Sequence, residues 1–187
     1  ADQMVSGGGI YLGEGTYNRV YRFGSTVQKT RKNTALEMDG AKRAVRVFNE
    51  INKELNSEPG RGNVINENTW ELPYIDGYVP SIEKLSNTIL EIYMKTERVL
   101  IDGYCKDNIL KEKQSGKLYC IDPGLAVRRN SVISKNYWYN PNASVKANRE
   151  VHYKYMVELI AEYKKNKKPD KSLPIFCIFG IDFYDQN

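Results

Sequence analysis

The chain has 187 residues, which is the usual size of one domain, and its 41% hydrophobic and 27% charged residues are typical of a soluble globular protein. Its formal net charge is +5, but the lysines and arginines are spread along the sequence. Because no zinc-finger, RNA-recognition or basic-helix pattern accompanies that charge, we expect no nucleic-acid partner.

Cysteine content and hydropathy exclude further classes of protein. The three cysteines are an odd number without metal-ligand spacing, which indicates a reducing compartment. No signal peptide is visible, and the apolar run at 173–181 is far too short to span a bilayer, so we expect no membrane span. We expect residues 1–9 to be a flexible leader or a remnant of cloning.

The first predicted element is a β-hairpin. Residues 10–12 and 20–23 are rich in β-forming side chains and flank a turn that contains Gly13 and Gly15. Glycine lets a backbone approach a ligand closely, and the N–H groups of such a turn can face an anion. The hairpin is therefore either an anion-binding turn or an ordinary glycine turn.

A strand at 26–29 and a helix follow the hairpin. Val27 and Lys29 lie on the same face of that strand because successive side chains alternate. Apolar residues at steps of three or four then predict an amphipathic helix that starts at residue 39 or 40 and ends at 56. Glu50 and Glu54 are four positions apart and share one side of it.

Residues 63–97 are predicted to contain a strand, a connection and a second helix. The strand covers 63–70 and is interrupted by asparagines, and residues 71–81 form the connection. Ser81 is a suitable N-cap for a helix that runs to about residue 97. The helix has an apolar face for burial.

The passage from 99 to 124 carries the most specific pattern. A loop containing Asn108 leads into a hairpin with a turn at 115–116, and the second strand ends in Asp122-Pro123-Gly124. Asparagine and aspartate supply the hard oxygen ligands that Mg²⁺ prefers. The alternative is a surface hairpin in which the aspartate only caps a turn.

Taken in order, a glycine turn, a strand lysine, a helix glutamate, an asparagine and an Asp-x-Gly resemble the protein kinase superfamily over residues 10–127. The resemblance implies an α+β, minimal two-lobed kinase-like fold in a single domain spanning 10–187. Its N-terminal lobe, 10–76, would be an antiparallel β-sheet plus one helix. Its C-terminal lobe, 77–187, would be reduced and helical.

The resemblance also implies a site for ATP and Mg²⁺. Lys29 would hold phosphates and pair with Glu50, with Glu54 and Glu37 as alternatives to Glu50. Asn108 and Asp122 would hold the metal. The residues implied for nucleotide binding are Gly13, Gly15, Val20, Lys29 and Glu50.

The expected catalytic aspartate is displaced. Kinases carry an aspartate five positions before the asparagine, and Gly103 occupies that position here. Asp102 lies one position too early and Asp107 directly precedes Asn108, so either carboxylate could accept the hydroxyl proton. A loose transition state depends more on positioning than on deprotonation, so a displaced base is tolerable.

Only 65 residues follow Asp122, fewer than a full helical lobe needs. In this the chain resembles small type III effector kinases that bacteria secrete into the host cell cytosol. The HopBF effectors, which phosphorylate a heat-shock chaperone of the ninety-kilodalton class, come first, and the OspG and NleH effectors, stimulated by ubiquitin-charged conjugating enzymes, second. This implies a serine/threonine kinase with a host protein substrate and a host activator. A pseudokinase adaptor, a small-molecule phosphotransferase and an unrelated basic binding domain are the alternatives.

Overall fold

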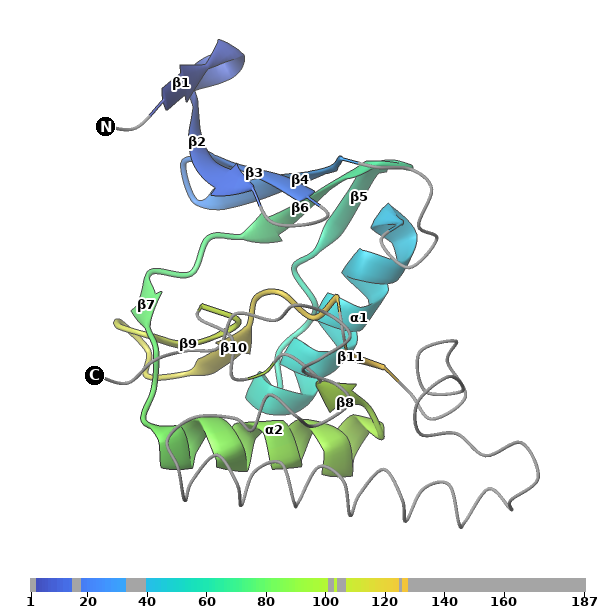
Figure 1. Ribbon diagram of the computed structural model, residues 1–187, viewed down its shortest axis with the longest axis vertical. Helices are drawn as coiled ribbons and strands as arrows, with labels where there is room; N and C mark the ends of the chain where they lie inside the picture. The colour runs from blue at the N-terminus through green and yellow to red at the C-terminus, as the bar shows by residue number, and fades with distance from the viewer. Residues whose placement is uncertain are drawn as a thin grey trace, which may run out of the picture.

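The computed structural model describes residues 3–14, 18–32, 40–100, 103, 107–124 and 126–127. These residues form an α+β fold of antiparallel strands and two helices, which confirms the predicted class. A large sheet lies at one end, a small sheet and helix α2 lie at the other, and helix α1 extends from the large sheet toward the lower part (Figure 1).

The large sheet has six antiparallel strands in the order β1-β2-β3-β4-β6-β5. Their bounds are Gln3–Val5 (β1), Gly9–Glu14 (β2), Asn18–Phe23 (β3), Thr26–Arg31 (β4), Asn63–Asn66 (β5) and Thr69–Pro73 (β6). The predicted leader at 1–9 requires a correction, because β1 pairs with β2 and a short 3₁₀ turn at Ser6–Gly8 joins them. Only residues 1 and 2 of that leader lie outside the described part.

The single strand predicted at 63–70 is two strands that pair with each other. The chain turns at residues 67 and 68, where the backbone N–H of Asn68 donates to Oδ1 of Asn66 at 2.9 Å. Asparagine side chains stabilise turns by such local bonds, so the asparagines that seemed to interrupt one strand connect two strands.

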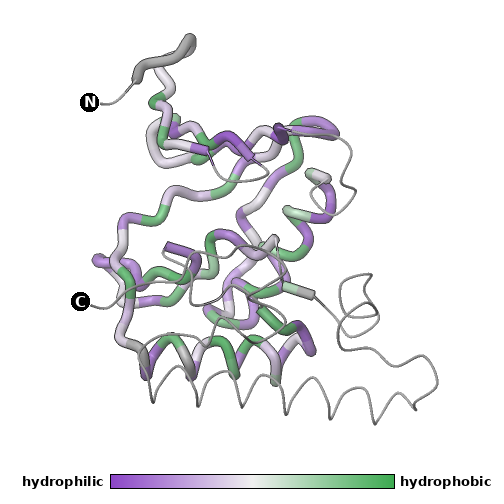
Figure 2. Tube along the Cα trace, in the orientation of Figure 1, coloured by the Kyte–Doolittle hydropathy of each residue, from purple (hydrophilic) through white to green (hydrophobic). Residues whose placement is uncertain are grey.

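Helix α1 spans Ala41–Asn56 and confirms the first predicted helix. Gly40 precedes it, and Ser57 ends it in a left-handed conformation with φ of 53°. Its apolar side chains form a core with two residues of β6, Trp70 and Leu72. The apolar positions appear as green segments along the helix in Figure 2.

Helix α2 spans Ile82–Thr96 and confirms the second predicted helix. The hydroxyl of Ser81 accepts a hydrogen bond from the backbone N–H of Lys84 at 3.2 Å, which is the predicted N-cap. Leu85, Ile89 and Ile92 on its inner face are each about 1% exposed. Among the described helices, none has the length and apolar character required to cross a membrane.

Short strands complete the lower part. β7 (Gly77–Tyr78), β9 (Ile109–Glu112) and β10 (Leu118–Cys120) form a three-stranded sheet, and β8 (Val99–Leu100) pairs with β11 (Ala126–Val127). The predicted hairpin after Asn108 is therefore confirmed as β9–β10. The predictions for residues 128–187 lie outside the described residues.

Candidate functional site

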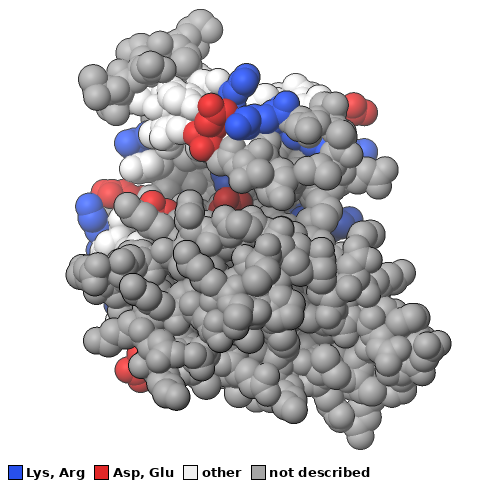
Figure 3. All heavy atoms as spheres, viewed as in Figure 1, with Lys and Arg blue, Asp and Glu red and all other residues white. Residues whose placement is uncertain are grey.

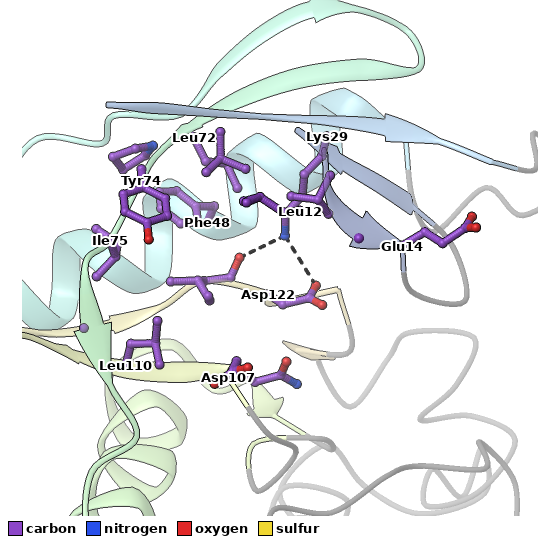
Figure 4. Close-up of a pocket in the computed structure, with 17 residues that line it drawn as sticks. Leu12, Glu14, Lys29, Phe48, Leu72, Tyr74, Ile75, Asp107, Leu110 and Asp122 are labelled. Carbon is purple, nitrogen blue, oxygen red and sulfur yellow. Dashed lines mark hydrogen bonds and ion pairs between the residues drawn. The ribbon is translucent and has the colours of Figure 1, made fainter. Parts of the chain in front are cut away.

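A cavity of about 520 Å³ separates the six-stranded sheet from the β9–β10 hairpin. This volume is in the range of sites for small molecules and cofactors. In Figure 4, large apolar and aromatic side chains gather at one end of the cavity, and Lys29, Asp122 and Glu14 lie at the other. The cavity thus has an apolar end and a polar end.

Apolar side chains line the cavity from both sides. Val20 and Val27 belong to the sheet, Phe48 to α1, and Leu110 to the hairpin. The connection from β6 to β7 forms the end wall, where the backbone N–H of Tyr74 donates to the carbonyl oxygen of Ser25 at 2.8 Å. An apolar slot between two layers suits a flat ring.

Lys29 is the principal cation at the polar end. It is 8% exposed, and its Nζ donates to the backbone oxygen of Ile121 at 3.1 Å. The same Nζ lies 3.9 Å from Oδ1 of Asp122, whose side chain is half-exposed (Figure 4). This ion pair across the cavity joins the sheet to the lower hairpin.

The hairpin register brings both Asn108 and Asp122 to the cavity. Cys120 pairs with Ile109, and beyond them the backbone N–H of Ile121 donates to the carbonyl oxygen of Asn108 at 2.9 Å. One further step of the register sets Asp122 opposite the residue before Asn108. That residue, Asp107, also lines the cavity and has φ of 65°.

Glu50 does not pair with Lys29. Its two carboxylate oxygens accept bonds from Nε and Nη2 of Arg98 at 3.3 and 3.2 Å. Of the alternatives, Glu54 uses its backbone oxygen to accept from Nζ of Lys95 at 3.1 Å, and Glu37 lies outside the described residues. The structure therefore does not form the lysine–glutamate pair that the sequence suggested.

The packing around Gly103 explains why a glycine, and not an aspartate, occupies the position five residues before Asn108. A Cβ atom there would lie 2.6 Å from Cδ1 of Ile89 on helix α2, so a carboxylate would have to displace the core. Asp102 is outside the described residues, whereas Asp107 lines the cavity. Of the two candidate bases, the structure describes only Asp107, and it places that residue at the cavity.

The glycine turn is described only at its ends. Gly15 lies outside the described residues, and Gly13 lines the cavity beside a bulge in β2. The φ of Gly13 is 142°, which L-residues with a side chain rarely adopt. Across the strand pair, Gly13 faces Val20, which in turn faces Lys29.

Glu14 carries a negative charge at the polar end. Lys32 lies 2.9 Å from Oε2 of Glu14 and Arg19 lies 3.7 Å from it. The hydrogen bond from Lys32, followed by the charge of Lys32, lowers the pKa of Glu14, so it remains ionised. Figure 3 shows acidic and basic side chains adjacent to one another over this end of the sheet.

Sequence reasoning missed Arg43 and Arg98, which hold the backbone after Asp122. Arg43 on α1 donates from Nη1 to the oxygen of Gly124 at 3.1 Å and from Nη2 to that of Ala126 at 3.3 Å. Arg98 donates from Nη1 to the same oxygen of Ala126 at 3.0 Å. No local pattern could reveal these contacts, because they join residues 28 to 83 positions apart.

The described part of the chain supplies only some of the ligands that a metal ion in the cavity would need. No group of three or more His, Cys, Asp or Glu side chains that could hold a metal occurs in the described part of the chain. Asp122 and Asn108 offer one carboxylate and one amide, and Mg²⁺ commonly completes such a set with phosphate oxygens and water. The arrangement fits a metal that arrives with a phosphorylated ligand.

No protein-family model matches this sequence, and no curated protein matches it either. The chemistry of the cavity therefore carries the functional conclusion. Its apolar end can hold a ring, its polar end combines the buried Lys29 with the carboxylate of Asp122, and Asn108 also lines the cavity.

Proposed function

We propose that the chain is an atypical, minimal protein kinase that uses ATP and Mg²⁺. One observation carries the proposal: Lys29, Asn108 and Asp122, which come from separate segments of the chain, line one cavity, with Lys29 and Asp122 at its polar end and apolar side chains at the other (Figure 4). Phosphoryl transfer depends mainly on positioning and on neutralising charge, and these three side chains are suited to both tasks.

The residues fit a nucleotide in two parts. Val20 and Val27 from the sheet and Leu110 from the hairpin would enclose the base, and Lys29 would neutralise phosphate charge. ATP with Mg²⁺, when bound, supplies the phosphoryl group and shields its negative charge. Lys29 would then exchange its contact with Asp122 for the phosphates and leave that carboxylate to the metal.

Asp107 is the residue we propose for the substrate hydroxyl. It is exposed, lines the cavity and directly precedes Asn108, so it can reach a hydroxyl that approaches from solvent. The buried position of Gly103 excludes a carboxylate in the usual slot without repacking. Asp102 stays as the alternative base.

The kinase interpretation divides the fold into two lobes within one domain, 10–187. The large sheet with α1 would be the N-terminal lobe, 10–76, to which β1 adds an edge strand. The connection from β6 to β7 would join it to a reduced helical lobe, 77–187, that begins with β7 and α2. The contact of Lys29 with Asp122 would join the lobes at the cavity.

The resemblance to small effector kinases adds a cellular setting and a substrate class to this proposal. We propose a serine/threonine kinase that a bacterium secretes into the host cytosol, with a host protein substrate such as a chaperone of the ninety-kilodalton class. A host activator belongs to the same proposal. The second candidate is a pseudokinase adaptor, which the pairing of Glu50 with Arg98 and the glycine at 103 favour.

The proposal is tested by incubating the protein with eukaryotic cell lysate and γ-labelled ATP–Mg²⁺. We expect a labelled protein band that disappears with Asp122→Ala and persists with Asp76→Ala. Asp76 is a matched control because its carboxylate is exposed and pairs with Lys113 at the surface.

Binding of a fluorescent ATP analogue to the purified chain separates the remaining outcomes. Nucleotide binding without a labelled band would favour the pseudokinase adaptor. Absence of both binding and labelling would reject the kinase-like site altogether.

A further inference from the structure

We infer that Arg98 is a positioning residue for Asp122: it fixes the backbone that follows this carboxylate against helix α1. Arg98 also takes the partner, Glu50, that Lys29 was predicted to have. This inference rests on the proposed function, because it assigns Arg98 a task in presenting Asp122 to a nucleotide-bound metal.

The guanidinium of Arg98 binds two elements at once, helix α1 and strand β11. It is 6% exposed and precedes β8. Nε and Nη2 bind the two oxygens of Glu50 on α1 at 3.3 and 3.2 Å, while Nη1 binds the backbone oxygen of Ala126 at 3.0 Å. The planar fork of arginine suits such a two-pronged carboxylate contact, and lysine cannot reproduce it.

Arg43 supports the same segment from one end of α1. The oxygen of Ala126 accepts from both Arg43 and Arg98, and that of Gly124 accepts from Arg43. The backbone N–H of Ala126 closes a turn onto the oxygen of Pro123 at 3.0 Å. The backbone directly after Asp122 is therefore fixed by side chains rather than by a long strand.

This arrangement gives each charge at the site a defined neighbour. Arg98 neutralises Glu50, so the charge of Lys29 faces Asp122 and the polar end of the cavity. Asp122 then has Lys29 on one side and a fixed backbone on the other. Loss of Arg98 would loosen Asp122 and also leave Glu50 without its arginine partner in a half-buried position.

The experiment measures the affinity of the full chain for a fluorescent ATP analogue, in excess Mg²⁺ and in EDTA. Groups that orient a metal ligand typically change metal affinity by about 10- to 100-fold when removed. We expect Arg98→Leu to weaken binding in Mg²⁺ by about tenfold or more and to change binding in EDTA by less than about twofold. Arg98→Lys should recover part of the loss, since one ammonium can still reach Ala126.

Arg46→Leu is the control, because Arg46 is an exposed arginine on helix α1, which also carries Glu50. It should leave both affinities unchanged. If Arg98→Leu does not fold, Arg98→Lys and Arg43→Gln decide the question. Arg43→Gln removes bonds to the same segment while keeping Glu50 and Arg98 paired, and it should weaken binding selectively in Mg²⁺.

Two results would overturn the inference alone. Equal weakening in Mg²⁺ and in EDTA would mean that Arg98 only supports the fold, and unchanged affinities in folded variants would mean that it has no role. A wild-type chain that binds no nucleotide in either condition would instead reject the proposed function, and the inference with it.

Discussion

Helix α1 carries the apolar core of the six-stranded sheet on one face and a set of side-chain hydrogen bonds to the lower part of the molecule on another. Toward the six-stranded sheet it presents apolar side chains, including Val45 and Phe48, which pack on Trp70 and Leu72. Toward the lower part it presents polar groups that bind named partners. Those groups are the side chains of Arg43, Glu50, Asn52 and Asn56.

The difference assigns two tasks to one helix. Apolar packing is non-directional, so it stabilises the sheet–helix unit in proportion to the buried area rather than through defined pairs of atoms. Hydrogen bonds require defined distances and angles, so the polar face sets where the lower hairpin lies against the sheet. The distance between Lys29 and Asp122 depends on that second task.

The apolar face should make the larger contribution to stability. Phe48 is 2% exposed, and Phe48→Ala would leave a cavity against the sheet. We expect the free energy of unfolding, measured by urea denaturation, to fall by about 3–5 kcal/mol. Met94→Ala is the control, because Met94 on α2 is 69% exposed, and it should cost far less. Similar losses for both variants would refute the packing assigned to α1.

The polar face should contribute less per residue but act on the cavity. Asn52 is 6% exposed; its Nδ2 donates to the oxygens of Phe48 and Cys120 at 2.9 Å, and its Oδ1 accepts from the N–H of Cys120 at 2.8 Å. Asn52→Leu keeps the volume but removes the two bonds between this side chain and the backbone of Cys120. We expect the free energy of unfolding to fall by about 1–3 kcal/mol, the usual cost of removing one partner of a buried hydrogen bond.

Asn56 supplies the internal comparison for that variant. Its Nδ2 makes one bond, at 2.9 Å, to the oxygen of Leu118, and the site is only partly buried. Asn56→Leu should therefore reduce the free energy of unfolding by less than Asn52→Leu. Equal effects of the two variants would show that burial of Asn52 does not matter.

The apolar face of α1 could be predicted from sequence because it repeats. Side chains at steps of three or four mark a helix whatever packs on it, and both described helices were predicted in this way. The position of Asn108 and Asp122 at the same end of the β9–β10 hairpin could also be predicted, because the pairing of adjacent strands is local. Patterns of this kind can be predicted because the residues that form them are close together in the sequence.

The partners of the polar face could not be predicted from sequence. Glu50 lies 48 positions from Arg98, and its choice of Arg98 over Lys29 depends on how α1 sits between the two parts. The glycine at 103 becomes understandable only once Ile89 is seen to fill the space beside it. Strand β1 was not predicted because a segment of three residues is too short to show a strand pattern, and β1 is recognised only by its pairing with β2.

The ion pair between Glu14 and Lys32 adds a third case to the comparison of apolar packing with buried polar bonds, because it is polar but exposed. The hydrogen bond and charge of Lys32 lower the pKa of Glu14 below its usual value of 4.5 in the folded chain. A lowered pKa stabilises the fold above the usual value, and that stabilisation is lost as the pH falls through the folded-state pKa. We expect Glu14→Gln to lower the melting temperature slightly at pH 7, with a difference from wild type that vanishes in acid and in high salt. Thermal melts of both proteins across this pH range provide the check, and a difference that persists in acid would mean that Glu14 acts through packing rather than through its charge.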